Sequence, residues 1–298
     1  MGTGTGIEWA HHTFNPWRGC SKVSSGCDNC YAEALSVRNP RVLGEWGPSA
    51  SRAMAAESYW RHPLAWERDA ARAGERHRVF CASLSDVFED RTDLVDSRAR
   101  LFQTIGQTPH LDWLLLTKRP ENIGHLLAEI EVFDLPPNVW LGTSVEDQAT
   151  ADKRIPHLLS IPARFRFLSC EPLLGLVELD PGLFHCETEL CPVCNEIACY
   201  HRTIDWVIVG GESGPGARPM HPNWVRALRD QCVEAGVSFF FKQWGRWRST
   251  LDVEEPDAVL AHPTAPWIES DDTTVMFAVG KKQAGRMIDG REWSEVPS

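Results

Sequence analysis

Short apolar runs, each followed by polar residues, alternate along this chain with segments of helical pattern. Such alternation is typical of βα units, in which parallel strands form one sheet and helices cover it. The segments WLLLT, DWVIVGG and SFFFKQ contain unbroken apolar stretches, as strands buried on both faces do. The predicted strands are residues 79–84, 113–117, 139–142, 164–169, 206–210 and 238–242, with a first strand near residues 13–14.

Helix signals fall between these runs. Pro120 opens the segment PENIGHLLAEIE, and Pro222 opens PNWVRALRDQCVEAG, which closes at Gly236. We therefore predict an α/β fold, namely a parallel (β/α) TIM-type barrel or partial barrel of about six to eight strands. Hydrophobic residues make up 43% of the 298 residues, which suffices for the core of one large domain.

Two segments interrupt the repeat. Residues 182–203 contain four cysteines and show little apolar periodicity, so we predict a small metal-binding insertion. Residues 251–275 are rich in Pro, Asp, Glu and Thr, which is typical of a surface segment. We accordingly predict a barrel over residues 1–250, the insertion within it, and an extension over residues 251–298 that packs on the barrel.

The charge balance and hydropathy exclude some classes of protein. A formal net charge of −11 argues against a basic coat for non-specific binding of nucleic acid. No apolar run of about 18 residues is present, and the first residues lack the basic and apolar regions of a signal peptide. We expect a cytoplasmic protein with no membrane partner.

Three cysteines, Cys20, Cys27 and Cys30, form a C-x6-C-x2-C group after the first predicted strand. In a reducing compartment, grouped cysteines indicate metal ligation rather than disulfides. Three thiolates suit an iron–sulfur cubane with one iron open to a small molecule. Structural zinc needs a fourth ligand, such as His11 or His12, and the spacing alone leaves both metals open.

The position of this group favours the iron–sulfur cluster. Gly19 and Gly26 directly precede ligands and let the loop wrap a bulky group. The carboxyl ends of barrel strands are also where reactive cofactors belong, whereas a structural zinc knuckle has no need of that position.

A second group lies within the predicted insertion. Cys186, Cys191, Cys194 and Cys199 follow the pattern C-x4-C-x2-C-x4-C, which offers the four thiolates of a closed zinc site. In a short segment with little core, bound metal would supply folding energy. An auxiliary iron–sulfur cluster is the alternative.

Several long motifs carry a family resemblance. The first cysteine segment, together with VWLGTSVED, RFRFLSCEPLLG, DWVIVGGESGPGARPMHPNWV, FFFKQWG and VGKKQAGRMIDGREW, resembles an uncharacterised, largely phage- and prophage-associated three-cysteine-motif family. That family is regarded as related to radical S-adenosylmethionine enzymes. The resemblance implies a [4Fe-4S] cluster on Cys20, Cys27 and Cys30, and S-adenosylmethionine as the source of a 5′-deoxyadenosyl radical. The first cysteine gap of six residues departs from the commonest pattern, C-x3-C-x2-C.

The resemblance also indicates residues that would bind the cofactor. Gly210, Gly211 and Glu212 resemble the Gly-Gly-Glu motif that holds the amino group of S-adenosylmethionine, although that motif normally follows the second strand. A tight turn is the alternative interpretation of these glycines. Further candidates follow predicted strands or lie near their ends: Lys118, Arg218 and Lys242 for a carboxylate or phosphate, and Ser144, Glu146 and Glu171 for ribose hydroxyls or a substrate proton. For each of the three cations an ordinary surface salt bridge is the alternative. Asp86 and Arg119 also follow predicted strands.

The leading hypothesis is a radical S-adenosylmethionine enzyme that acts on a nucleotide, a nucleic-acid base or another unknown substrate. A flavodoxin or ferredoxin would serve as its reductant. A zinc-dependent barrel hydrolase or nucleic-acid repair enzyme is the second hypothesis. The third is a non-catalytic, zinc-containing module that binds nucleic acid through stacked tryptophans, against which the net charge counts.

Overall fold

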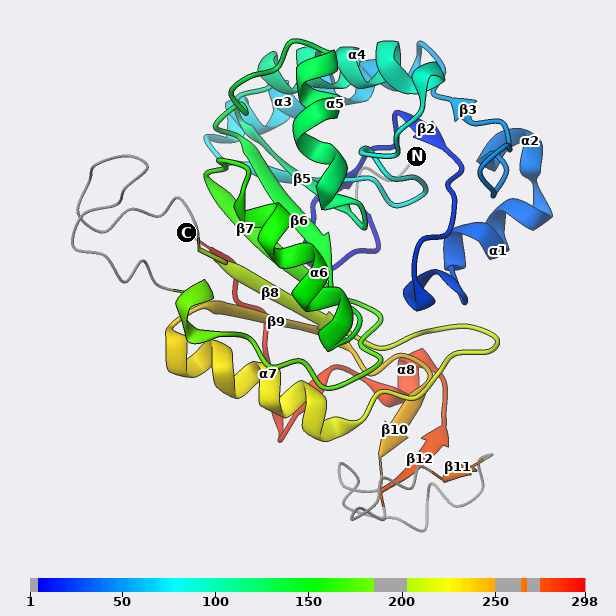
Figure 1. Ribbon diagram of the computed structural model, residues 1–298, viewed down its shortest axis with the longest axis vertical. Helices are drawn as coiled ribbons and strands as arrows, with labels where there is room; N and C mark the ends of the chain where they lie inside the picture. Colours follow the sequence, from blue (N-terminus) through cyan, green and yellow to red (C-terminus); the bar gives the residue numbers. More distant parts are fainter. Residues whose placement is uncertain (1–4, 185–202, 250–263, 267–273, 298) are drawn as a thin grey trace.

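The computed structural model describes residues 5–184, 203–249, 264–266 and 274–297. Seven parallel strands form one curled sheet, a half-barrel, in the order β1-β4-β5-β6-β7-β8-β9 (Figure 1). This confirms the predicted α/β partial barrel. The strands are β1 (His12–Thr13), β4 (His77–Cys81), β5 (Leu111–Thr117), β6 (Val139–Ser144), β7 (Phe165–Cys170), β8 (Trp206–Gly210) and β9 (Ser238–Gln243).

Each predicted strand is present, with its ends shifted by a few residues. The largest difference is at β4, which ends at Cys81 although we predicted a strand as far as residue 84. Beyond Cys81 the backbone has other partners, since Leu84 N–H donates to Asn15 Oδ1 and Leu84 C=O accepts from Gly19 N–H. The strand therefore ends early, because Leu84 bonds to the segment that leads into the three cysteines and not to a neighbouring strand.

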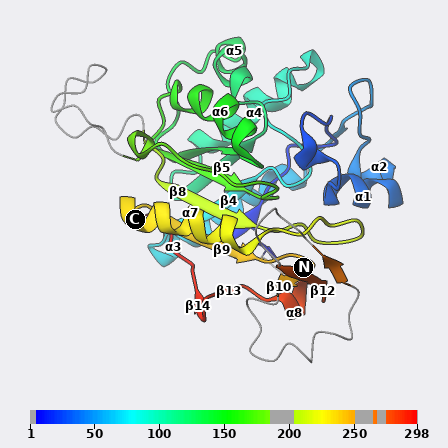
Figure 2. The same cartoon turned by 60° about the horizontal axis from the view of Figure 1, so that its bottom comes forward.

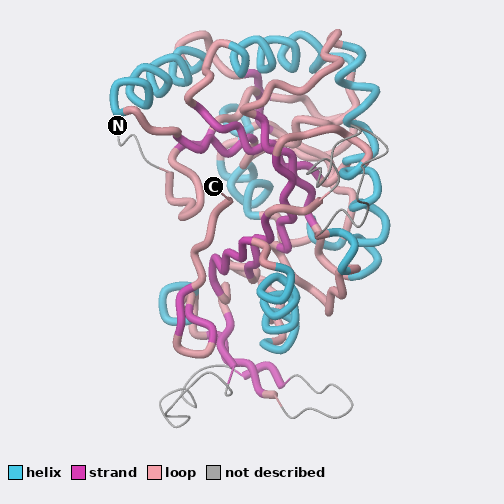
Figure 3. The backbone as a smooth tube through the Cα atoms, turned by 90° about the vertical axis from the view of Figure 1, so that its left-hand side faces the viewer, coloured by secondary structure: helices cyan, strands magenta, loops and turns pink. Residues whose placement is uncertain are grey.

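Helices cover the convex side of the sheet, as Figure 3 shows. They pack on side chains such as Val79 and Leu115, whose chain neighbours point to the concave side, as strand geometry requires. These helices are α3 (His62–Ala73), α4 (Val95–Gly106), α5 (Ile123–Glu129), α6 (Gln148–Leu159) and α7 (Pro222–Ala235).

Local signals explain where the helices begin and end. Asp147 and Thr150 form a capping box at the start of α6. Pro222 begins α7, and Gly236 ends it in a left-handed conformation with φ +67°, as predicted. Pro120 begins a short 3-10 turn, η4 (Pro120–Asn122), that leads into α5.

An apolar cluster fills the concave side near the amino ends of the strands. Its aromatic rings come from five different strands and from Trp9, which precedes β1, and they meet mostly edge to face. Trp9 lies 4.7 Å from Phe80 and 6.0 Å from Trp206 between ring centroids. We call this cluster the aromatic floor, and its rings are Trp9, Phe80, Trp140, Phe167, Trp206 and Phe240.

Shorter elements lie at the two ends of the sheet. The remaining ones before β4 are β2 (Trp17–Arg18), η1 (Ser25–Cys27), α1 (Tyr31–Arg38), α2 (Pro40–Leu43), β3 (Ala53–Met54) and η2 (Tyr59–Arg61). Those that follow β4 are η3 (Thr92–Leu94), η5 (Pro181–Leu183), β10 (Trp247–Ser249), β11 (Thr264–Pro266), β12 (Val275–Ala278), α8 (Lys281–Ala284), β13 (Met287–Ile288) and β14 (Arg291–Glu292). β10, β12 and α8 lie together beyond the end of β9 (Figure 2).

The segment after residue 274 contacts the last strand of the sheet. Phe241 N–H donates to Trp293 C=O, and Trp244 N–H donates to Gly285 C=O. Most of the predicted cysteine insertion, residues 185–202, lies outside the described residues, so the proposed division of the chain stays a prediction. Within the described ranges, no helix is long and apolar enough to cross a membrane.

Candidate functional site

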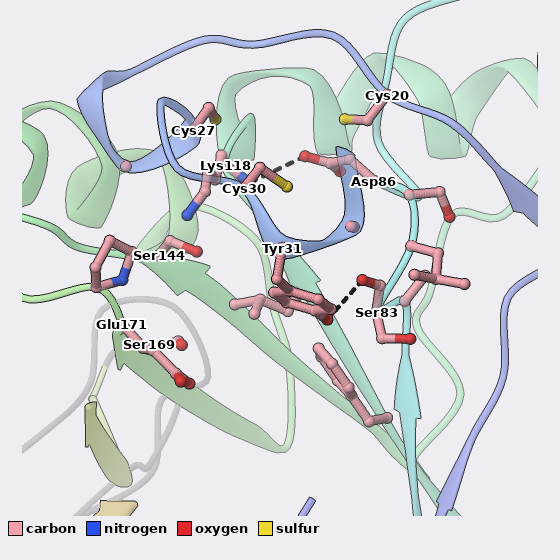
Figure 4. A pocket seen from close by; sticks show the side chains of 18 of the residues that line it. Cys20, Cys27, Cys30, Tyr31, Ser83, Asp86, Lys118, Ser144, Ser169 and Glu171 are labelled. Atoms are coloured by element: carbon pink, nitrogen blue, oxygen red, sulfur yellow. Dashed lines mark hydrogen bonds between the residues drawn. The ribbon is translucent and has the colours of Figure 1, made fainter. Parts of the chain in front are cut away.

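A cavity of about 640 Å³ opens at the carboxyl ends of the strands. Its wall includes most of the predicted site residues, and Figure 4 shows how they surround the space. The predicted residues that line it are Cys20, Cys27, Cys30, Lys118, Ser144, Glu171, Gly211, Glu212 and Lys242. Glu146, Arg218 and Gly210 are not in the wall; the first two support it from behind.

The three cysteines lie on one loop, residues 19–31, which we call the cysteine loop. Cys27 ends the short helix η1, and Cys30 directly precedes α1. All three are free and half-buried. Gly26 is required by close packing, because a Cβ atom there would overlap the Glu146 side chain. The loop thus crosses the open end of the half-barrel at close range.

Hydrogen bonds hold the cysteine loop to several strand ends. Ser24 Oγ donates to Glu146 after β6, at 3.0 Å. Asn29 Nδ2 donates to Glu212 after β8, at 2.9 Å. On the opposite side, Tyr31 Oη donates to the Ser83 carbonyl after β4, at 2.7 Å (Figure 4). The loop position is therefore set by polar contacts to three separate strands.

Glu146 is a fully buried carboxylate behind the loop. Lys118 Nζ lies 2.9 Å and Arg154 Nη1 2.6 Å from its two oxygens. Burial alone would raise the pKa of Glu146, but the two cations outweigh it and hold that pKa below its usual value. Glu146 thus acts as a charged support, bonded to the loop through Ser24.

Glu212 has a similar arrangement on the other side. Its carboxylate pairs with the Arg218 guanidinium and also accepts the Arg218 backbone N–H at 2.8 Å. Burial opposes ionisation, yet the hydrogen bonds from Arg218 and Asn29 keep the pKa of Glu212 below its usual value. Arg218 in turn donates to the Ser25 carbonyl, at 2.8 Å. Glu212 and Arg218 therefore both bind the cysteine loop, as Glu146 does.

Glu171 and Lys242 form an ion pair across the end of the sheet. Lys242 Nζ lies 2.7 and 3.0 Å from the two Glu171 oxygens. Both side chains retain some exposure, and both line the cavity. Ser144 and Ser169, paired in register on β6 and β7, line it as well. This side of the cavity thus offers a carboxylate, an ammonium group and two hydroxyls to a polar ligand.

Three residues of the site were not among the predicted ones, namely Ser24, Asn29 and Tyr31, which bind strand ends from the loop. Asp86 and Arg119, which we expected near the site because they follow predicted strands, form a buried ion pair at 2.9 Å beside Cys20. The loop residues carry no such signal, because their partners are distant in the sequence.

The three thiols on one loop offer the donor set of an iron–sulfur cluster with one open iron. Among the residues that the structure describes, no three His, Cys, Asp or Glu side chains are grouped to hold one metal ion. His11 and His12, considered as zinc ligands, do not line the cavity, and His12 contacts His77.

Burial affects the thiols themselves. It raises the pKa of Cys20 to about 12 and also raises the pKa of Cys30. Since metal ligation requires thiolates, these protons would be released on binding. The second cysteine group, Cys186, Cys191, Cys194 and Cys199, lies outside the described residues.

A family model described as "Protein of unknown function (DUF5131)" matches residues 4–297. The fold and site define a half-barrel protein with a group of three cysteines at its cavity. Because the family model matches almost the whole sequence, the chain belongs to the DUF5131 family. No curated protein matches the sequence. Among solved structures, a spore photoproduct lyase complexed with dinucleoside spore photoproduct is similar, with 12% sequence identity and a TM-score of 0.44. The similarity covers 90% of this chain and 68% of that one.

Proposed function

We propose that this protein is a radical S-adenosylmethionine enzyme. The observation that supports it most is the placement of Cys20, Cys27 and Cys30, three free thiols on one loop that line one cavity above a parallel half-barrel. Three thiolates leave one iron of a [4Fe-4S] cluster open to a further ligand. When bound, the cluster and S-adenosylmethionine would supply a 5′-deoxyadenosyl radical.

The residues of the chain would bind, orient and shield these groups. The three cysteines would hold the cluster, and Lys242, Glu171, Ser144 and Ser169 would contact S-adenosylmethionine or substrate from the opposite wall. Glu146 and Glu212 would act indirectly, since each is already bonded to cations and to the cysteine loop. Glu212 also lines the cavity, so the role we predicted for it, a ligand of the cofactor's amino group, stays a prediction beside its support of the loop.

The cavity volume suits a ligand of that size together with part of a substrate. Pockets for small molecules measure about 300–1,000 Å³, and this one is about 640 Å³. We propose a nucleotide or nucleic-acid base as substrate, a flavodoxin or ferredoxin as reductant, and zinc or an auxiliary cluster on the second cysteine group.

The test is anaerobic reconstitution with iron and sulfide, followed by metal analysis and electron paramagnetic resonance with and without S-adenosylmethionine. The wild type should form one reducible cluster at this site, whose signal changes when S-adenosylmethionine is added. Cys27→Ala should lose both properties. Cys232→Ala is the matched control, because Cys232 is buried in α7 away from the cavity.

A Cys191→Ala/Cys194→Ala variant separates the second metal site from the first. It should lose zinc, or additional iron, and keep the signal that responds to S-adenosylmethionine. A wild type that binds zinc alone and ignores S-adenosylmethionine would contradict the proposal and favour the hydrolase or the binding module.

A further inference from the structure

We propose that Arg119 is a positioning residue for Cys20, and that its charge raises the reduction potential of the group held by the three cysteines. The inference rests on the proposed function and assigns a role to a residue outside the three-cysteine motif. Arg119 follows β5, whereas Cys20 lies on the cysteine loop, so the fold alone brings the two together.

The guanidinium of Arg119 binds both Cys20 and the next residue. Its Nη1 donates to Cys20 Sγ at 3.7 Å, which is within hydrogen-bond range for sulfur. Its Nη2 donates to the Ser21 carbonyl at 2.7 Å and to Ser21 Oγ at 2.9 Å. One planar cation thus fixes the backbone after Cys20 and contacts the sulfur itself.

Arg119 is held in place from behind. Asp86 Oδ2 accepts Arg119 Nη1 at 2.9 Å and the Lys118 backbone N–H at 3.0 Å. Asp86 Oδ1 accepts Thr117 Oγ1 at 2.7 Å and the Phe88 backbone N–H at 3.0 Å. Because both carboxylate oxygens are occupied, Asp86 fixes the orientation of the guanidinium, which is itself buried.

The three cysteines are therefore not equivalent. Cys30 is the N-cap residue of α1, where the helix end offers only partial positive charge and its side chain makes no capping hydrogen bond. Cys20 instead receives a hydrogen bond from a cationic side chain. A full positive charge interacts more strongly than a backbone dipole at a buried site.

This arrangement has a consequence for electron transfer. Hydrogen bonds to ligand sulfurs and net charge are among the factors that set the potential of an iron–sulfur cluster. Reduction adds negative charge, which a nearby guanidinium stabilises. Arg119 should thus make the site easier to reduce and keep the Cys20 end of the loop in place.

The test compares Arg119→Gln with Arg166→Gln after anaerobic reconstitution. Arg166 is an equally buried cation on β7 that donates to the Ile161 carbonyl at 2.7 Å and does not line the cavity. Redox titration monitored by electron paramagnetic resonance gives the potential, and metal analysis gives the occupancy. Arg119→Gln should decrease the ratio of reduced to oxidised cluster at fixed potential at least tenfold, which equals a downward shift of about 59 mV for one electron.

Arg166→Gln should leave the potential unchanged. Equal shifts in the two variants would mean that the effect is a general loss of packing, and the proposal would fail. No shift in a folded, loaded Arg119→Gln protein would overturn it as well. Thermal unfolding of each variant shows which ones are folded.

Arg119→Lys covers the case in which the glutamine variant does not fold. Lysine keeps the charge but lacks the planar fork, so it cannot bind Ser21 and Cys20 together. Because the charge is kept, we expect a smaller decrease in the ratio of reduced to oxidised cluster, of about threefold or less. A decrease of tenfold or more would refute the role of the charge. Failure of the proposed function would be seen separately, as a wild type that takes up no cluster.

Discussion

The two ends of the concave face differ in chemistry although the same strands build both. At the amino ends, the aromatic floor is buried and uncharged. At the carboxyl ends, buried or partly buried charges occur in pairs, such as Glu146 with Arg154 and Glu171 with Lys242. The floor stabilises the half-barrel by packing, whereas the charged end holds the cysteine loop and shapes the cavity. Substitutions at the two ends should accordingly separate stability from ligand binding.

Trp206→Ala at the floor should have the largest effect on stability. The side chain is fully buried between Trp9, Phe167 and Phe240, so truncation leaves a cavity. We expect a loss of about 3–5 kcal/mol in the free energy of unfolding, measured by urea denaturation. Trp206→Phe should cost less, and equal losses in the two variants would contradict the packing argument.

Glu146→Gln should come next, with a loss of about 3 kcal/mol, because Lys118 and Arg154 would lose their shared anion. The pKa of Glu146 is lowered in the fold, so its contribution is present above the unfolded value near 4.3 and is lost as pH falls through the folded value. The variant should therefore lose less stability than the wild type on acidification. If the unfolding free energies of the variant and the wild type, measured by chemical denaturation, fell in parallel with decreasing pH, this account would be wrong.

Gly26→Ala should disturb the charged end alone. The added methyl group overlaps Glu146, so the cysteine loop must move, at a cost of about 1–3 kcal/mol. Because the cysteine loop moves, the occupancy of the cluster after reconstitution should also decrease. In a Glu146→Ala background the same substitution should cost much less, and a double-mutant cycle that shows additive effects would exclude the contact as the cause.

The sequence predicted the sheet well because its strands are continuous apolar runs whose burial depends on local residues, as in β5 and β8. It also predicted that Cys20, Cys27 and Cys30 lie at the carboxyl end of the strands. It could not pair Asn29 with Glu212 or Arg119 with Cys20, because these contacts join residues far apart in the chain. Likewise, nothing local distinguishes Glu146, which faces the loop, from Glu171, which faces the cavity.

Lys242→Met should have the smallest effect on stability and a clear effect on binding. Its ion pair with Glu171 is partly exposed, so removal should cost less than about 1 kcal/mol. Both residues nevertheless line the cavity that the three cysteines also line, where a ligand carboxylate would meet the ammonium group. We expect about tenfold weaker binding of S-adenosylmethionine to the reconstituted protein, measured by equilibrium dialysis. Arg100→Met, which breaks a surface pair with Glu57, is the matched control and should bind normally. Equal affinities for Lys242→Met and the wild type would mean that the Lys242 ammonium group pairs with Glu171 but does not contribute to binding of the ligand.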